Sequence, residues 1–517
     1  MGSERNIMLK QFDGSALDRR SLYFGDNLKV LRTLPDNLVA LCCTDPPFNS
    51  GRDYNIFLGA DAQETAFKDT WKYDDVAITT RRDVAERAAN QEDGYVAAER
   101  FLKGFDVMFD SPTRGKDAEL RSYLTFMAPR IVEIRRVLKE TGSFYLHCDA
   151  TASHYLKELC DVIFGRKQFR NEIVWHYAHM SATKRHFPRK HDIIFRYTKS
   201  NDWIFNADDI RIPYTESSLN REKYKIKKRP GFGEEVDSNW LHEKGKIPDT
   251  VWDMPLCRGK ERFGYPTQKP RALYERIIKA SSNEGDIVLD AFCGCGTTID
   301  AAETLKRGWI GIDLTLLALE PIQERMQARH HLKAFEDYPV YGYPVNLQEV
   351  KVMLANGENS QRYKDFENWA VTRLGMNPTR HVGDGGIDGI GNYQLWHDEM
   401  METVDTKAVC EVKSGRIQLP TVRAFRTAMN DAEATIGILI GLDTISAGIK
   451  QEMLKEGYYE HNGEKYPRLQ YWQITDEYFA NPASLMLDIK LPWQPEPIYH
   501  IEPHYDGEQQ NLGLYNP

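Results

Sequence analysis

Short apolar runs alternate along the chain with longer stretches of helical periodicity. Residues 38–43 (LVALCC) and 143–148 (SFYLHC) are nearly continuous apolar runs. Runs of this length are typical of strands that are covered on both faces. Between them, over 119–139, apolar residues recur every three or four positions, which is the period of a helix with one buried face. The pattern therefore predicts strand, helix and strand in that order.

The same alternation continues to about residue 330. Further strands are predicted at 172–177, 191–198, 286–292 and 309–314, and further helices at about 151–164, 271–282, 297–307 and 315–330. Strands that alternate with helices predict an α/β fold with a Rossmann-like, doubly wound parallel sheet.

A chain of 517 residues is too long for one hydrophobic core, so more than one domain is expected. The first α/β unit is predicted to span 1–335, with a polar, irregular stretch at 178–262 inside it. A linker with two Tyr-Pro steps falls at 336–355, a smaller α/β unit at 356–480 and a Pro-rich tail at 481–517.

Composition narrows the class of protein. No run of about 18 apolar residues is present, and the first residues, MGSERNIMLKQF, contain no apolar signal region. The eight cysteines show no C-x-x-C spacing, which favours reduced thiols over zinc ligands or disulfides. The sequence thus predicts a cytoplasmic protein with no membrane partner.

The net charge of −9 does not favour nucleic-acid binding. Any such binding would use local basic patches, and two exist, at 184–191 (KRHFPRKH) and 223–230 (KYKIKKRP). A solvated charged face is the simpler interpretation of either patch taken alone.

Directly after the first predicted strand stands the stretch TDPPFNSGRDYN, residues 44–55. Pro46 and Pro47 end the strand, because proline lacks an N–H and has a fixed φ. They leave a rigid corner with the Asp45 carboxylate on one side and the Phe48 ring on the other. An ordinary turn is the better interpretation of an isolated D-P-P.

A second motif, VLDAFCGCGTT at 288–298, runs from a strand through glycines into a helix. Gly294 and Gly296 allow a sharp turn and close approach of a ligand. Ile299 replaces the third glycine of a dinucleotide fingerprint, and no Lys-Ser/Thr pair follows, so no pyrophosphate or triphosphate site is indicated. The next strand ends in Asp313, where a ribose-hydroxyl acceptor belongs. A nucleoside without a pyrophosphate fits, and S-adenosylmethionine is the predicted ligand.

Together these motifs resemble the DNA amino-methyltransferases, with the catalytic corner ahead of the cofactor loop as in the β class. Matching stretches also occur at 142–149 (GSFYLHCD), 171–177, 264–278 (GYPTQKPRALYERII) and 307–314. The resemblance covers about 20–330. Ala291 and Cys295 depart from the usual residues of the loop, but both are of similar size to those they replace.

The resemblance implies a methyltransferase that acts on a base rotated out of double-stranded DNA. Asp45 and the Pro46 carbonyl would accept hydrogen bonds from the base amine, Pro47 would keep the corner rigid, and Phe48 would stack on the base. D-P-P-F favours adenine N6, with cytosine N4 as the alternative. The expected cofactor residues are Asp290, Phe292, Gly294, Gly296, Thr297 and Asp313. The expected phosphate contacts are Lys184, Arg185, Arg189, Lys227, Lys228 and Arg229. His147 and Asp149 are expected to be structural.

The C-terminal unit contains GDGGIDGIG at 383–391 and AVCEVKSG at 408–415. On a strand, Glu411 and Lys413 share one face while Val412 points to the other. Asp388 followed by E-x-K is the minimum for a metal-dependent nuclease, although E-x-K alone is more often a surface hairpin. Asp388 and Glu411 would hold Mg²⁺, and Lys413 would orient or deprotonate the attacking water.

With the preceding glycines, about 360–445 resembles the Mrr-like branch of the PD-(D/E)XK restriction nucleases. The resemblance extends to 363–375 (YKDFENWAVTRLG), where Glu367 is a candidate accessory metal ligand. The stretch 390–407 is long for this family, so an inserted hairpin is expected.

The favoured function is a restriction–modification protein that joins a methyltransferase and a nuclease. The alternatives are a stand-alone methyltransferase whose C-terminal unit no longer cuts, and a C-terminal unit that serves only for DNA binding or partner docking. The chain carries no Walker A motif, so it would not translocate on DNA with ATP by itself. A homodimer and a separate ATPase or restriction subunit are left open.

Overall fold

The computed structural model describes most of the chain. The described residues are 19–48, 54–57, 63–67, 71, 73–178, 184–185, 187–216, 218–219, 241–257, 261, 268–314, 318–344, 346–355, 360–374, 376–379, 386–398, 400–477 and 489–493.

A nine-stranded sheet forms the first unit, in the order β11-β1-β10-β9-β2-β5-β7-β6-β8. Its strands are β1 Arg20–Phe24, β2 Val39–Thr44, β5 Leu138–Cys148, β6 Phe169–His176, β7 His191–Thr198, β8 Val251–Asp253, β9 Ile287–Asp290, β10 Gly308–Asp313 and β11 Val340–Tyr341. The predicted α/β fold is confirmed. The sheet is not wholly parallel, however, because β7 runs antiparallel to β5 and β6. The segment that joins β6 to β7 carries no described helix, and a connection without a crossover helix favours an antiparallel pair.

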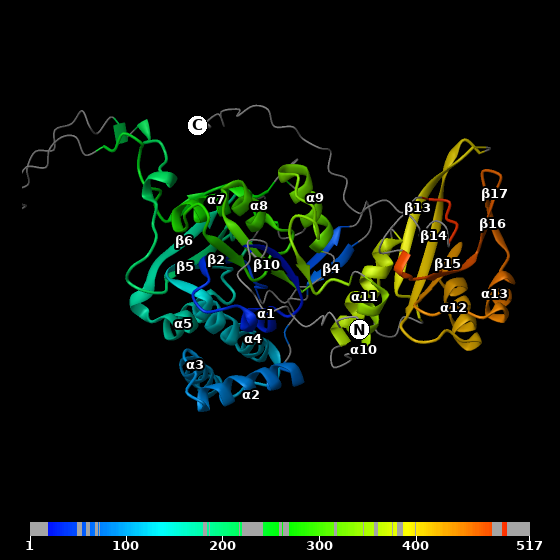
Figure 1. Ribbon diagram of the computed structural model, residues 1–517, viewed down its shortest axis with the longest axis horizontal. Coiled ribbons are helices and arrows are strands. Elements are labelled where there is room, and N and C mark those ends of the chain that lie inside the picture. Colours follow the sequence, from blue (N-terminus) through cyan, green and yellow to red (C-terminus); the bar gives the residue numbers. More distant parts are fainter. Residues whose placement is uncertain are drawn as a thin grey trace, which may run out of the picture.

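Helices cover both faces of this sheet (Figure 1). On one face, α1 Asn27–Thr33, α4 Gly115–Val137 and α5 Ser153–Phe164 contact the strands, and α2 Asp75–Ala89 and α3 Tyr95–Met108 pack outside them against other helices of the same face. The other face packs against α7 Arg271–Ser281, α8 Thr297–Thr304 and α9 Leu319–His330. Along β2, Leu41 belongs to one apolar cluster and Cys42 to the other. This explains why the strand is apolar from Val39 to Cys43.

The central parallel strands bring the two sequence motifs together. β9 lies between β10 and β2, and all three run in the same direction. Asp45 follows β2, while Asp290 and Asp313 close β9 and β10. The carboxyl ends of neighbouring parallel strands form the crevice in which α/β sheets bind ligands.

A five-stranded sheet forms the second unit, in the order β12-β13-β14-β15-β18. Its strands are β12 Asn377–Pro378, β13 Gly389–His397, β14 Glu402–Lys413, β15 Ile436–Gly441 and β18 Leu469–Gln473, and its helices are α11 Ser360–Arg373, α12 Leu419–Asp431 and α13 Ala447–Leu454. Gly389 to His397 pairs with Glu402 to Cys410, so the expected inserted hairpin is confirmed. Two further hairpins, β3 Tyr54–Phe57 with β4 Gln63–Phe67 and β16 Tyr458–His461 with β17 Glu464–Pro467, complete the described strands.

The segment expected to be a linker is folded against both units. Val340 and Tyr341 form β11 beside β1, and α10 (Leu347–Ala355) packs against α11. Tyr343 lies between the units: its ring is 5.8 Å from that of Phe24, and its hydroxyl accepts hydrogen bonds from Trp369 Nε1 (2.6 Å) and Arg373 Nη2 (2.8 Å). The connecting segment therefore bridges the two units through Tyr343.

Within the described residues, no helix is long and apolar enough to cross a membrane.

Candidate active sites

The corner after β2 carries a buried ion pair. Lys269 Nζ contacts Asp45 Oδ2 and lies 5.1 Å from the centre of the Phe48 ring. Lys269 is only 8% exposed, so its ammonium group has little contact with bulk water. It belongs to the TQKP stretch directly before α7, 224 residues from Asp45. The sequence motif was noted, but the role of its lysine was not predicted.

The second oxygen of Asp45 faces His147 from β5. His147 Nδ1 is 3.2 Å from Asp45 Oδ1, and Nε2 is 3.1 Å from Oδ2 of Asp192 on β7. Asp192 also accepts a hydrogen bond from the Tyr177 hydroxyl at 3.1 Å. The expectation that His147 is structural did not anticipate this contact. Asp149, by contrast, accepts from the Thr151 backbone N–H and hydroxyl, which is a local turn.

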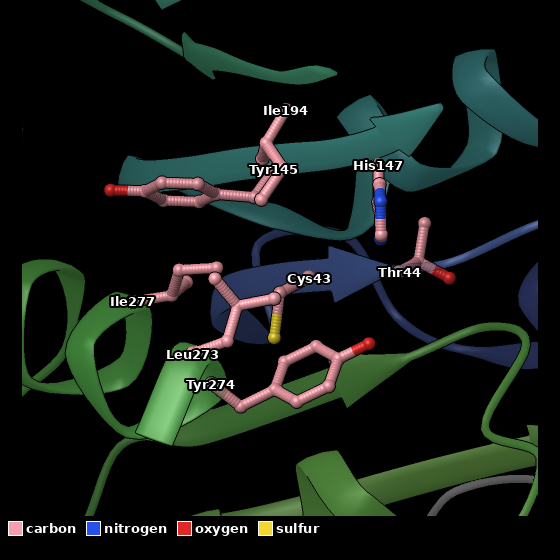
Figure 2. A pocket seen from close by; sticks show the side chains of 8 residues that line it. All are labelled: Cys43, Thr44, Tyr145, His147, Ile194, Leu273, Tyr274 and Ile277. Carbon is pink, nitrogen blue, oxygen red and sulfur yellow. The ribbon is translucent and has the colours of Figure 1, made fainter. Parts of the chain in front are cut away.

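Two aromatic rings lie near His147, and His147 also lines a small cavity. The Phe48 ring lies 5.3 Å and the Trp175 ring 5.5 Å from the His147 ring. Figure 2 shows the cavity on the inner side of the corner, where His147 from β5 and Tyr274 from α7 both approach Thr44 at the end of β2. The corner thus packs against the end of the sheet, and the Phe48 ring is available to stack on a ligand.

The glycine loop has the geometry expected for close approach of a ligand. Gly294 and Gly296 both adopt positive φ values, +50° and +76°. The backbone N–H of Gly294 donates to Asp313 Oδ2 at 2.7 Å, which ties the loop to the end of β10. A Cβ at Gly296 would come within 2.9 Å of Ile322 on α9, so only glycine fits there without a shift.

Asp290 links the loop to the corner. Its Oδ1 accepts hydrogen bonds from Thr44 Oγ1 and from the Phe292 backbone N–H, both at 3.1 Å. Thr44 is the residue immediately before Asp45. Burial raises the pKa of Asp290 to about 7, and the nearby charge of Asp45 adds to the rise. The two motifs therefore share one electrostatic environment although 245 residues separate their acids.

Thr297 and Phe292 are placed differently from one another. Thr297 is buried, and its hydroxyl accepts from Arg325 Nη1 at 3.1 Å, which anchors the first turn of α8 to α9. The Phe292 ring is partly buried and lies 6.2 Å from that of Phe126. Thr297 thus contributes to the support of the loop, while Phe292 lies beside α4.

The second site lies on the β13–β14 side of the smaller sheet. Asp388 directly precedes β13, and its Oδ2 accepts from the Val412 backbone N–H at 2.7 Å. Lys413 Nζ is 2.6 Å from Glu411 Oε1. A Cβ on Gly386 would lie 3.0 Å from the same oxygen, so the glycine-rich turn passes directly over Glu411. The structure therefore brings the predicted Asp, Glu and Lys together.

Glu411 has the properties of a cation ligand. Its Oε2 is buried and has no hydrogen-bond partner among the described residues. Burial raises the pKa of Glu411, and the charge of Asp388 adds to the rise, while Lys413 opposes it. A hard divalent cation would satisfy such an oxygen, so Asp388 and Glu411 fit the metal that the family implies.

Glu367 lies on α11 and is buried. Across the described ranges, no group of three or more His, Cys, Asp or Glu side chains is arranged to hold a metal. Among the described residues, Asp388 and Glu411 are therefore two carboxylates at one site, and no described side chain completes a set of three.

The predicted DNA contacts are only partly described. Lys184, Arg185 and Arg189 are exposed, as phosphate contacts must be. Lys227, Lys228 and Arg229 lie outside the described residues.

Comparison with known proteins agrees with the division of the chain into two units. Residues 39–324 match the profile of a family described as DNA methylase, and 361–457 match one described as restriction endonuclease. The first match covers more than half of the chain, so the chain belongs to the DNA methylase family. The resemblance to a DNA methyltransferase joined to an Mrr-like nuclease domain is confirmed.

Among curated relatives, the type II methyltransferase M.HpaI of Haemophilus parainfluenzae is 28% identical over 60% of this chain and 75% of its own length. The DNA adenine methyltransferase YhdJ of Escherichia coli (strain K12) is 27% identical over 62% of this chain and 86% of its own. A solved structure of the cytosine-N4-specific PvuII DNA methyltransferase shares 14% identity, with a TM-score of 0.36 over 59% of this chain and 86% of that one.

Proposed function

We propose that the first unit transfers a methyl group from S-adenosylmethionine to the N6 amine of an adenine rotated out of double-stranded DNA. The observation that carries this proposal is the position of Asp45. The preceding residue, Thr44, hydrogen-bonds to Asp290 at the start of the glycine loop. Lys269, which contacts the Asp45 carboxylate, lies 5.1 Å from the centre of the Phe48 ring. A methyl donor held by the loop and a base stacked on the ring would meet at this carboxylate.

The amine of adenine is a poor nucleophile, because its lone pair is delocalised into the ring. The cofactor supplies a methyl group already activated on a sulfonium. Asp45 and the Pro46 carbonyl would accept the two N–H groups of the amine and so favour the localised lone pair in the transition state. The adjacent prolines hold both acceptors rigidly, and Lys269 offsets part of the charge on Asp45. Asp313 is suited to accept the ribose hydroxyls.

The test is mass spectrometry of nucleosides from DNA incubated with the protein and S-adenosylmethionine. N6-methyladenine is the expected product, and it should be absent with Asp45→Ala. N4-methylcytosine as the sole product would contradict the choice of base and favour the cytosine alternative. Base-level detection of the methyl group on the same DNA would give the recognition sequence.

The exposed basic residues of the 178–262 stretch are proposed to contact DNA phosphates. Each phosphate contact contributes about 0.9 to the slope of log affinity against log salt concentration. Replacing Lys184, Arg185 and Arg189 by glutamine should therefore weaken binding to all DNA sequences and reduce that slope by about 2 to 3. An unchanged slope would remove these residues from the interface.

We propose further that the second unit is a divalent-metal-dependent DNA endonuclease, which makes the chain a restriction–modification protein. Asp388 and Glu411 would hold Mg²⁺, which stabilises charge on the scissile phosphate when bound. Lys413 would orient or deprotonate the attacking water. The buried Oε2 of Glu411 has no hydrogen-bond partner among the residues that the structure describes. This supports the proposal over a docking module, because such an atom costs stability unless a ligand satisfies it.

Cleavage is tested with unmethylated and pre-methylated plasmid and Mg²⁺ or Mn²⁺, scored by nicking and linearisation. Cleavage that survives both Asp388→Ala and Glu411→Ala would show that this site is wrongly placed. Methylation without cleavage of either plasmid would favour a stand-alone methyltransferase, or a nuclease that needs a separate subunit.

A further inference from the structure

His147 lies between two carboxylates that come from different strands. Its Nδ1 is 3.2 Å from Oδ1 of Asp45, and its Nε2 is 3.1 Å from Oδ2 of Asp192. The imidazole is only 4% exposed, so water has little access to either nitrogen. Asp45, His147 and Asp192 thus form a row of three side chains. The position of each proton in this row depends on the three side chains themselves.

The hydrogen-bond partners indicate which nitrogen of His147 carries hydrogen. Although burial raises it, the pKa of Asp192 is held below its ordinary value by the hydrogen bonds from His147 and Tyr177 and by the charge of Lys269. An ionised carboxylate can only accept, so Nε2 is the donor to Asp192. In the neutral imidazole, Nδ1 then presents a lone pair to Asp45.

This leaves two acceptor atoms that face each other. Asp45 Oδ1 and His147 Nδ1 are both buried, and neither has a hydrogen-bond partner among the residues that the structure describes. Two acceptors in this arrangement are unfavourable unless a proton lies between them. The row therefore has room for one more proton than it holds when Asp45 is ionised and His147 is neutral.

We propose, on the basis of the methyltransferase function above, that His147 takes up from Asp45 the proton that adenine N6 releases during methyl transfer. The N6 lone pair forms the new N–C bond, and the electron pair of the broken S–C bond stays on sulfur. N6 is then positively charged. Its N–H bond breaks with the electrons remaining on nitrogen, and the proton passes to the Asp45 carboxylate and on to Nδ1. The result is an imidazolium between two carboxylates, which returns the proton to solvent after the product leaves.

His147 acts through Asp45 and is thus a positioning residue that also receives a proton. The groups that face it from the surrounding elements are Asp45 after β2, Asp192 on β7, Tyr177 after β6, Lys269 before α7 and Tyr274 on α7. This set contains two carboxylates and only one ammonium group. A positive charge on the His147 imidazole would therefore balance the negative charge around it.

The proposal predicts the pH dependence of methylation. At low pH the shared proton is already present, so the row cannot accept another and the rate falls. At higher pH the shared proton is absent, so the row can accept the proton from N6 and the rate reaches a plateau. Without the imidazole, only the Asp45 carboxylate remains to hold this proton, so the fall in rate should move to lower pH by at least about one unit.

The experiment measures single-turnover methylation of DNA by the full chain from pH 5 to 9, with His147→Asn and Asp192→Asn. We expect His147→Asn to lower the plateau rate about 10- to 100-fold and to shift the low-pH fall, with S-adenosylmethionine affinity within twofold of wild type. Asp192→Asn should also lower the rate, because a side-chain amide can donate to Nε2 and reverse the tautomer. In His147→Ala, added imidazole should restore part of the rate.

His176→Asn is the matched control. His176 Nδ1 is 3.0 Å from Asp253 Oδ1 on the same sheet, but this pair makes no contact with Asp45 among the described interactions. Its rate and pH profile should match wild type. A wild-type rate and pH profile in His147→Asn would overturn the proposal. So would a lower rate with neither a shifted pH profile nor imidazole rescue, because that pattern indicates packing alone. If the wild-type chain methylates no DNA, the methyltransferase function itself fails.

Discussion

Each candidate active site contains a carboxylate paired with a lysine, but the surroundings of the two pairs differ. Lys269 contacts Asp45 in the first unit, and Lys413 lies 2.6 Å from Glu411 in the second. The side chain of Lys269 is 9% exposed, whereas that of Lys413 is 39% exposed. The lysine of the first pair is thus enclosed by protein, whereas the lysine of the second is open to solvent, although its partner Glu411 is as deeply buried as the first pair.

The remaining oxygen of each carboxylate shows the difference most clearly. Asp45 Oδ1 faces the ring nitrogen of His147, which can exchange a proton with it. Glu411 Oε2 is buried without a described partner, and Asp388 adds negative charge beside it. Under the functions proposed above, the same kind of ion pair would serve proton uptake where a histidine completes it, and cation binding where a second carboxylate does.

The strongest test of this comparison is to remove one carboxylate at a time. Asp45→Ala should abolish methylation and leave metal-dependent cleavage, while Asp388→Ala or Lys413→Ala should abolish cleavage and leave methylation with its sequence specificity. Each loss should be at least about a hundredfold, since each removes a charged group at the reacting atoms.

One plasmid preparation, unmethylated and pre-methylated, serves both assays with every variant. Chelation by EDTA should copy the Asp388→Ala phenotype only. Loss of both activities in any one variant, with the fold intact, would show that the sites are not separable.

Asp290 extends the comparison to a buried carboxylate with no described ion pair. Its pKa of about 7 means that ionising it costs the folded state up to about 4 kcal/mol above pH 7, whereas the unfolded chain ionises it near pH 4. The contribution of the protonated Asp290 side chain to the free energy of unfolding is thus fully present below about pH 4. It is lost as the pH rises to about 7. Asp290→Asn, which mimics the neutral acid, should stabilise the cofactor-free protein at pH 8 and leave it unchanged at pH 4. Denaturant unfolding at both pH values measures this, and equal effects at the two would contradict it.

Asp313 tests whether the glycine loop depends on its carboxylate. Asp313→Ala removes the acceptor of the Gly294 N–H and the expected ribose contact, so S-adenosylmethionine should bind about 10- to 100-fold more weakly in calorimetry. Asp286→Ala, at the opposite end of the same strands, is the control and should bind normally. Normal affinity in Asp313→Ala would remove that residue from the site.

The smallest expected effect concerns the contact between the units. Tyr343→Phe removes the hydroxyl that accepts from Trp369 and Arg373, which should cost about 1–2 kcal/mol at the interface. Trypsin digestion should then cut between the units faster, while both activities persist. Tyr341→Phe, on β11 of the same segment, is the comparison variant. Equal digestion rates in both variants would show that Tyr343 does not join the units.

Much of this protein could be predicted from local sequence. The run LVALCC predicted a strand buried on both faces, because apolar residues at every position have no other favourable place. E-x-K predicted a shared face for Glu411 and Lys413, because side chains alternate along a strand. The glycines of 294 and 296 predicted a turn that only their backbone freedom permits.

Only the tertiary structure decided which distant residues meet. The order of the parallel strands places β2 beside β9, so Asp45 and Asp290 share one environment. Lys269 and His147 reach Asp45 from 224 and 102 positions away, and no local pattern encodes such a contact. Side-chain periodicity determines which face a residue occupies, but the order of strands in a sheet arises from packing of the whole chain. The sequence therefore determined the chemistry available at each strand end, and the fold decided which groups act together.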